Sequence, residues 1–334
     1  LPQMFKNIDL LRQWFTDVKV IFAYDLSVDD TYRKLSPESS AEAGQWRTDR
    51  AEYQREIMDA FNDPDTQRIV FMKSAQVGAT EILLNVIGYY IDQDPSPMLI
   101  MQPTLAMSQA FSKDRLSAMI RDSEKIRDCV KDARSRDSGN TVLSKKFAGG
   151  NLNIVGSNSA AGLASRPIRI VLADEVDRYE QSAGAEGDPI SLATKRTTTF
   201  WNKKIYMCST PTIKGLSRIE AAFEESDKRY YNVPCPECNH KQILKWKNVV
   251  WDEDKPETAA YACEGCGSVI NESKKQWMLK NGEWIATATK SDTAGFHISE
   301  LYSVWSTWAD MAKNFLEAKK QPEMLKTWIN TSLG

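Results

Sequence analysis

The sequence predicts an α/β fold, a parallel sheet flanked by helices and interrupted by a small cysteine-containing subdomain. Three observations support this prediction. An apolar strand at 68–72 leads through a loop into a helix, an aliphatic strand at 168–173 ends in two adjacent acids, and two C-x-x-C pairs follow near residues 235 and 263. Strands that alternate with helical segments are typical of parallel sheets, and cysteine pairs at this spacing are typical of metal-binding ribbons.

The 334 residues are enough for a large hydrophobic core and about two or three modules. The net charge of −2 creates no global positive field, so contact with nucleic acid would depend on local basic pairs at 145–146, 195–196 and 203–204. No apolar run approaches the roughly 20 residues of a membrane span, and the first residues lack a signal-peptide pattern. We therefore expect a soluble, intracellular protein with no membrane partner.

The first segment, residues 1–44, is expected to be an N-terminal helix followed by a linker. Apolar residues recur at spacings of three and four between Ile8 and Phe22, which predicts an amphipathic helix. Its apolar face would either pack on the main domain or dock a partner. The polar stretch Ser27 to Gly44 predicts the linker, and a second helix is expected from Trp46 to Phe61.

The stretch that organises the chain runs from a buried strand, Arg68 to Met72, through a loop into a helix from Glu81 to Ile91. Aligned with the pattern G-x-x-x-x-G-K-[ST], the loop has Lys73 in place of the first glycine and Ala79 in place of the lysine. Backbone N–H groups of such a loop and the positive end of the helix bind phosphates whatever the side chains are. The candidate nucleotide-binding residues are Lys73, Ser74, Ala75, Gln76, Val77, Gly78, Ala79 and Thr80, with Gln54 upstream as a candidate for the adenine edge.

The alanine at position 79 leaves two interpretations open. In the first, Lys73 reaches back from the start of the loop and supplies the missing charge, so the site is a working variant. In the second, Ala79 replaces a lysine and the chain is an inactive form that holds nucleotide unhydrolysed. A strand-turn-helix without nucleotide is the structural alternative, and the later segments argue against it.

Later strands are expected to bring polar side chains to the same edge of the sheet. Strands are predicted at 98–102, 152–156 and 205–208, and the most apolar one, Ile168 to Ala173, runs directly into Asp174 and Glu175. Adjacent acids at a strand end repel each other unless a cation or a catalytic task compensates. In a P-loop site the Asp holds Mg²⁺ and the Glu polarises the attacking water. The strand at 205–208 delivers Ser209, Thr210, Pro211 and Thr212 to this edge. Their hydroxyls are candidates for sensing the γ-phosphate, and a simple polar strand end is the alternative.

Two C-x-x-C pairs predict a Cys₄ zinc ribbon within residues 233–290, with ligands Cys235, Cys238, Cys263 and Cys266. Metal-free reduced thiols are the alternative, and a catalytic zinc is disfavoured because no ligand position is left open. His240 is a less favoured substitute ligand. Strands at 242–246 and 249–251 are expected to form a small sheet between the pairs.

The chain after the ribbon shows a helical apolar pattern over 306–334 that is broken at Pro322. We expect residues 45–232 to form the core domain, with the ribbon inserted after its last strand. Residues 291–334 are expected to form a helical connector.

The ordered set of motifs resembles the ATPase portion of the phage terminase large subunit family of the lambda type. The motifs are 53–56, 73–80, 112–116, 162–166, 174–175 and 209–212, and the resemblance covers nearly the whole chain from residue 45. It implies a P-loop NTPase fold of the ASCE, RecA-like type and a motor that uses ATP and Mg²⁺ to package double-stranded DNA into a procapsid. It also implies the host-cell cytoplasm as location, and as partners the portal, the small terminase subunit and further copies in a ring.

The resemblance implies roles for individual residues. These are adenine contact for Gln54, Mg²⁺ binding for Thr80 and Asp174, catalysis for Glu175, and coupling of hydrolysis to movement for Ser209 to Thr212. Arg166 resembles the arginine that such motors insert into a neighbouring subunit's site; a salt bridge within its own domain is the alternative. Some relatives carry the functional lysine at the position of Ala79 and others at that of Lys73, so this departure bears on activity.

Two other functions fit parts of the pattern. A helicase or another DNA-dependent ATPase would share the loop and the acidic pair. A non-catalytic scaffold that binds nucleic acid through its ribbon would need neither. In the family, the region after the connector leads toward a nuclease domain of ribonuclease-H type, and we expect that domain and its activity to be absent from this chain.

Overall fold

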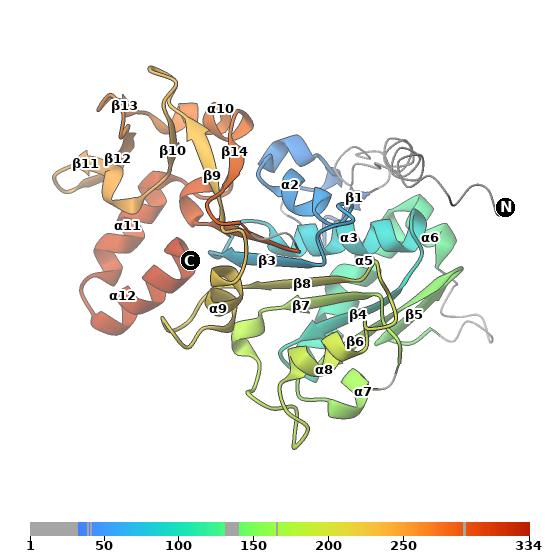
Figure 1. Cartoon of the computed structure of the whole chain (residues 1–334). Coiled ribbons are helices and arrows are strands. Elements are labelled where there is room, and N and C mark those ends of the chain that lie inside the picture. The colour runs from blue at the N-terminus through green and yellow to red at the C-terminus, as the bar shows by residue number, and fades with distance from the viewer. Residues whose placement is uncertain (1–32, 39, 41, 131–139, 165, 290–291) are drawn as a thin grey trace, which may run out of the picture.

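The computed structural model describes residues 33–38, 40, 42–130, 140–164, 166–289 and 292–334 (Figure 1). The amphipathic helix expected at 8–22 lies outside these residues. Within the described part of the chain, no helix combines the length and the apolar character that a membrane crossing requires.

A ten-stranded sheet forms the centre of the described structure. Its strands run, in spatial order, β10 (Lys241–Ile243), β9 (Arg229–Pro234), β15 (Thr293–Ile298), β3 (Arg68–Lys73), β8 (Lys204–Ser209), β7 (Ile170–Asp174), β4 (Pro97–Gln102), β6 (Gly150–Gly156) and β5 (Ser144–Phe147), while β14 (Glu283–Ala286) also pairs with β9. Pairing is parallel from β9 through β6, and β10, β14 and β5 pair antiparallel. The mostly parallel α/β sheet expected from the sequence is confirmed.

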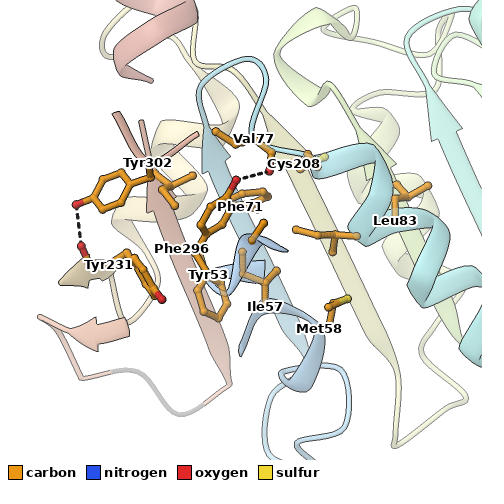
Figure 2. Close-up of a cluster of buried hydrophobic side chains, with 14 of the residues drawn as sticks. Tyr53, Ile57, Met58, Phe71, Val77, Leu83, Cys208, Tyr231, Phe296 and Tyr302 are labelled. Atoms are coloured by element: carbon orange, nitrogen blue, oxygen red, sulfur yellow. Dashed lines mark hydrogen bonds between the residues drawn. The ribbon is translucent and has the colours of Figure 1, made fainter. Parts of the chain in front are cut away.

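Helices cover both faces of the sheet, because the central strands are apolar on both sides. Along β3, Ile69 and Phe71 point into one hydrophobic cluster and Val70 and Met72 into the other. The first cluster includes side chains of α2 (Gln54–Asp59) and α3 (Ala79–Asp92), shown in Figure 2. The second includes those of α8 (Pro189–Lys195) and α9 (Arg218–Glu224). Two packed layers therefore hold β3 and β7 rigidly.

The remaining helical segments lie along the chain as follows. The expected helix at 46–61 is divided into a 3₁₀ turn, Thr48–Ala51, and α2. The segment after β4 runs as α4 (Leu105–Ala110), a π-helical stretch (Phe111–Leu116) and α5 (Ser117–Asp122), followed by α6 (Glu124–Cys129). A short helix, α7 (Ala160–Ala164), precedes β7, and a two-stranded ladder joins β1 (Lys34–Leu35) to β2 (Gly44–Gln45).

The sheet continues beyond the strand at which we expected it to end. Strand β15 lies between β3 and β9, inside the stretch expected to be only a helical connector. Its sequence signal is weak because Gly295 and His297 interrupt the apolar run. Gly295 is required there: a Cβ would lie 1.8 Å from Ser226 Oγ, and its N–H donates to Asp227 Oδ1 at 2.8 Å. The ribbon is thus inserted between core strands β9 and β15, and not after the last core strand.

The ribbon region contains a three-stranded antiparallel sheet of β11 (Val249–Asp252), β12 (Lys255–Ala262) and β13 (Val269–Ile270), followed by α10 (Lys275–Lys280). The expected partner strand near 242–246 is shorter and pairs instead with β9 in the large sheet. The chain continues after β15 with α11 (Trp308–Ala318), α12 (Pro322–Trp328) and a π-helical turn, Ile329–Leu333. Pro322 occupies the first turn of α12, where its missing N–H costs nothing.

Candidate functional site

The loop between β3 and α3 has the backbone of an anion-binding turn. Gln76 and Gly78 both adopt left-handed conformations, with φ of 58° and 76°. Among the described residues, no acceptor is found for the backbone N–H groups of residues 76–80, which lead into the amino end of α3. Free N–H groups at a helix start, together with the helix dipole, favour a bound phosphate.

The first half of the loop is held by the C-terminal part of the chain. Ser74 N donates to Ile298 O at 3.0 Å and Ala75 N donates to Thr331 O at 2.7 Å. Ser303 Oγ donates to the carbonyl of Gln76 at 2.7 Å. These bonds fix the start of the loop and leave its second half free to bind a ligand.

Gln54 and Tyr53 lie beneath the loop. Tyr53 OH and Gln54 Nε2 both donate to Val77 O, at 3.2 and 3.0 Å (Figure 2 shows the tyrosine bond). Gln54 is completely buried, and its Oε1 has no hydrogen-bond partner among the described residues. Its amide therefore supports the loop from below, and nothing in this geometry directs it at an adenine edge.

Lys73 connects the loop to the acidic pair. Its Nζ lies 2.8 Å from Glu175 Oε1 and 3.5 Å from Thr210 Oγ1. Although burial acts to lower it, the pKa of the Lys73 ammonium is raised above its ordinary value, because the Glu175 carboxylate lies beside it. Glu175 itself has a left-handed backbone, with φ of 54°, and its Oε2 has no hydrogen bond within the described residues. Arg178 Nε is 3.6 Å from that oxygen.

Asp174 is the last residue of β7, and its side chain is half-buried. It accepts hydrogen bonds from Gln102 Nε2 at 3.0 Å and from the Cys208 thiol at 3.1 Å. Burial raises the pKa of Asp174 above its ordinary value. A neighbouring cation favours the ionised form of such a carboxylate, as expected for a metal ligand.

Lys73, Asp174 and Glu175 lie together at one edge of the sheet, but the acidic pair does not line the large pocket beside the loop. The ends of β3, β8 and β7 are adjacent, because Met72 pairs with Ser209 and Asp174 pairs with Cys208. The pocket, of about 770 Å³, is lined by Lys73, residues 76–81 and side chains from 35–51, and not by Asp174 or Glu175. Thr80 lines it, and Lys73 borders both regions.

The stretch Ser209 to Thr212 follows β8 and is tied to two other segments. Ser209 Oγ accepts from Asp177 N at 3.2 Å, and both the N–H and the hydroxyl of Thr212 donate to Asp177 Oδ2 at 3.0 Å. Asn330 Nδ2 donates to Thr212 O at 2.6 Å. Thr210 is the member that reaches Lys73, and Pro211 lies between these two anchored positions.

Arg166 lies far from the acidic pair of its own chain. It is exposed, and it precedes the amino end of β7, whereas Asp174 is at the carboxyl end. The four residue steps from Ile170 to Asp174 separate those ends by roughly 13 Å. No ion pair of Arg166 is found within the described residues, so the alternative of an internal salt bridge gains no support.

The four predicted ribbon cysteines form one cluster. Their Sγ atoms all lie within 4.8 Å of one another, with Cys235–Cys266 at 3.9 Å and Cys238–Cys263 at 3.8 Å. Four thiolates around a tetrahedral Zn²⁺, with bonds of about 2.3 Å, are about 3.8 Å apart. His240 is exposed and packs on Gly265, outside this cluster. The donor set therefore fits zinc.

Sequence reasoning missed several residues that complete the site. Gln102 and Cys208 hold Asp174, Asp177 holds the stretch after β8, and Ser303 and Thr331 hold the loop. Gln102 ends the apolar strand β4 as Asp174 ends β7. A polar residue at such a strand end was therefore a sequence signal that could have identified Gln102. The contacts of residues 298–331 had no sequence signal, because they arise from folding of the distant chain end.

Comparison with known proteins gives two family matches. Residues 40–284 match "Phage terminase large subunit gpA, ATPase domain", and residues 293–334 match "Terminase large subunit gpA, endonuclease domain". The second match begins at β15 and covers the segment that we expected to be a helical connector. The expectation that the nuclease domain is absent is therefore wrong for this segment, which matches the family model of that domain.

The chain is 32% identical to the terminase large subunit of Enterobacteria phage P21 and 28% identical to that of Escherichia phage lambda. Each match covers 90% of this chain and 50% of the relative, so the chain spans about half the length of these curated relatives. The crystal structure of the HK97 bacteriophage large terminase is similar in fold, with a TM-score of 0.54 and 12% identity over 93% of this chain and 55% of that one. The chain belongs to the phage terminase large subunit gpA family, whose ATPase domain accounts for most of its length.

Proposed function

We propose that this chain binds and hydrolyses ATP with Mg²⁺, and that it acts in the host cell as the ATPase motor of a terminase that packages double-stranded DNA into a procapsid. The family match supports the activity, and the ion pair between Lys73 and Glu175 is the observation that supports this location for the site. In this proposal the β3–α3 segment is a P-loop in a RecA-like sheet.

The phosphates would bind to the N–H groups of residues 76–80, with Lys73 as the cation. Ala79 is 8% exposed and packs in the hydrophobic cluster of α3 while it also borders the pocket, so it contributes apolar packing and no charge to the site. The Lys73 ammonium already lies at the strand edge beside Thr210 and Glu175. These contacts favour the working-variant interpretation over an inactive form.

Thr80 and Asp174 would hold Mg²⁺, through a hydroxyl and a carboxylate of the hard-oxygen type that it prefers. The ion neutralises charge on the phosphates when bound. Glu175, with Oε2 free of hydrogen bonds among the described residues, would orient the attacking water. Lys73 would exchange its contact with Glu175 Oε1 for a contact with a phosphate oxygen. Both carboxylate oxygens of Glu175 would then be available to the water.

Coupling and assembly would depend on groups outside the pocket. Ser209 to Thr212 touch Lys73 on one side and Asn330 on the other, which suits a link between hydrolysis and movement. The exposed Arg166 would enter the site of a neighbouring subunit in a ring. The portal, the small terminase subunit and double-stranded DNA are the partners we propose from the family.

The ribbon cysteines would hold a structural Zn²⁺. The cluster ties the turn before β10 to the turn after β12, and a closed set of four thiolates leaves no position for substrate. Zinc would then stabilise the region inserted between β9 and β15.

The proposal is tested by ATP turnover of this chain with Mg²⁺, with and without double-stranded DNA. Turnover that DNA stimulates, without any strand displacement, is expected. A strand-displacement activity would favour the helicase alternative. Failure to bind ATP with or without Mg²⁺ would favour a nucleic-acid-binding scaffold.

A further inference from the structure

A pocket of about 770 Å³ extends from the phosphate loop to residues 35–51, which carry none of the motifs named above. Its walls come from the β1–β2 region and the 3₁₀ turn at residues 35–51, from Lys73, the loop and the start of α3, and from three isolated residues, Arg115, Gln276 and Trp305. Pockets for complete small ligands have about 300–1,000 Å³. The space therefore exceeds what phosphates alone would fill.

Polar contacts hold the wall at residues 35–51 together and join it to Gln276. Arg50 donates to the Glu42 carboxylate through Nε and a terminal nitrogen, with a shortest contact of 2.8 Å, and Gln276 Nε2 donates to Arg50 O at 3.3 Å. The hydrogen bonds from Arg50 lower the pKa of Glu42, and a hydrogen bond from the Trp305 side chain contributes further to this shift. The pocket wall is thus an ordered surface built from residues far apart in sequence.

Two tryptophans line the pocket, Trp46 and Trp305, and their side chains differ in exposure. The Trp46 side chain is 7% exposed and has Arg33 over its ring, whereas Trp305 is 40% exposed. A Cβ added at Gly78 would lie 3.0 and 3.2 Å from atoms of the Trp305 ring, so the ring lies against the loop. Trp305 N donates to Ser303 Oγ at 3.2 Å, and Ser303 is itself bound to Gln76 O. The ring is therefore fixed relative to the loop and open to the pocket.

We propose that Trp305 is the stacking platform for the base of the bound nucleoside triphosphate. This inference rests on the proposed ATP site. With the phosphates at the N–H groups of residues 76–80, the base would extend into the adjoining pocket and lie on the exposed indole face. Aromatic faces bind every base through stacking, and purines present the larger surface. The buried Gln54, which does not line this pocket, has no such access.

The opposing structural explanation is that Trp305 only packs on Gly78 and supports the loop. The two explanations differ in their dependence on the base. A stacking platform contributes to ATP binding and not to binding of inorganic tripolyphosphate, which carries the same phosphates without a base. A loop support contributes equally to both.

Isothermal titration with each ligand in the presence of Mg²⁺ tests the proposal. Trp305→Leu keeps apolar packing on Gly78 but removes the aromatic face, and Trp305→Phe restores it. We expect Trp305→Leu to weaken ATP binding about tenfold or more, Trp305→Phe to weaken it less than about threefold, and tripolyphosphate binding to change less than about twofold. Trp201→Leu is the matched control, since Trp201 is 77% exposed and does not line the pocket.

Equal losses for ATP and tripolyphosphate, or an unchanged ATP affinity, would overturn the stacking role. The wild-type chain provides a second measurement that needs no folded variant: ATP should bind more tightly than UTP and than tripolyphosphate. Wild-type protein that binds all three equally overturns the platform alone. Wild-type protein that binds none of them overturns the nucleotide site together with the platform.

Discussion

Lys73 and Glu175 are 102 positions apart in sequence, and their side chains form an ion pair of 2.8 Å at the carboxyl ends of β3 and β7. The strand between them, β8, adds Thr210 at 3.5 Å from the same ammonium. The three strand ends therefore meet at one cation, and a phosphate that binds there must compete with a carboxylate. This relationship leads to the first two predictions.

Lys73→Ala should abolish ATP turnover, while Ala79→Lys should not raise it. The Lys73 ammonium already lies at the strand edge beside Glu175, so a lysine at position 79, which borders the pocket, would add a second cation without supplying a missing one. Initial rates of phosphate release, compared at saturating ATP, check both variants. A strong increase for Ala79→Lys would instead identify a disabled loop.

Glu175→Gln should retain ATP binding but lose hydrolysis, and mixing it with Arg166→Ala should restore part of the rate. Each mixed assembly would contain interfaces that pair an intact Glu175 with an intact Arg166 from different subunits. The measurement is turnover of the mixture against each variant alone. No recovery at any ratio would place the function of Arg166 within its own chain.

Gly78→Ala should weaken ATP binding strongly and destabilise the fold by about 1–3 kcal/mol. A Cβ there would lie 2.3 Å from Gln54 Nε2 and 3.0 Å from the Trp305 ring. Gly215→Ala is a matched control, because Gly215 has φ of +78° against +76° for Gly78 but has open space around its Cα. Denaturant unfolding and ATP titration of the two variants separate the effect of the positive φ, which both share, from the effect of the steric contacts, which only Gly78→Ala makes. Equal effects of the two substitutions would exclude a steric cause.

Removal of zinc should lower the melting temperature, and Cys263→Ser should reproduce the loss. The four thiols form a closed cluster, so one missing ligand leaves an incomplete site. Elemental analysis should find about one zinc ion per chain in protein purified without chelator. Cys129→Ser is the control, since this cysteine lies outside the cluster. Protein without any metal would refute the assignment.

Lys204 should make the fold more stable as the pH rises from about 8 toward 10.5. Burial lowers the pKa of Lys204 to about 8, while its ammonium donates to the carbonyls of Asp63 and Thr66. Between these values the unfolded chain holds a proton that the folded chain has released, so the free energy of unfolding increases by up to about 1.4 kcal/mol per pH unit. Denaturant unfolding of wild type and Lys204→Gln across this range should differ in slope. Parallel pH profiles would contradict the lowered pKa.

The sequence predicted the local elements of the site well. Strand β3, the loop, α3 and the end of β7 were found within two residues of their observed bounds, because apolar runs and a glycine turn are local signals. The cysteine spacing likewise predicted a cluster that the structure brings together. Gln54 was located on the correct helix, but its proposed contact with adenine finds no support in its buried position.

By itself, the sequence determined the parallel α/β core, the loop between β3 and α3, the acidic pair at the end of β7, and the four clustered cysteines. Only the tertiary structure decided that β15 lies beside β3, that residues 298–331 hold the loop, and that Trp305 borders the pocket. The physical reason is the range of the interactions. Periodicity and motif spacing follow from neighbouring residues, whereas a strand with Gly295 and His297 is specified by contacts with Ser226 and Asp227, which are distant in the chain.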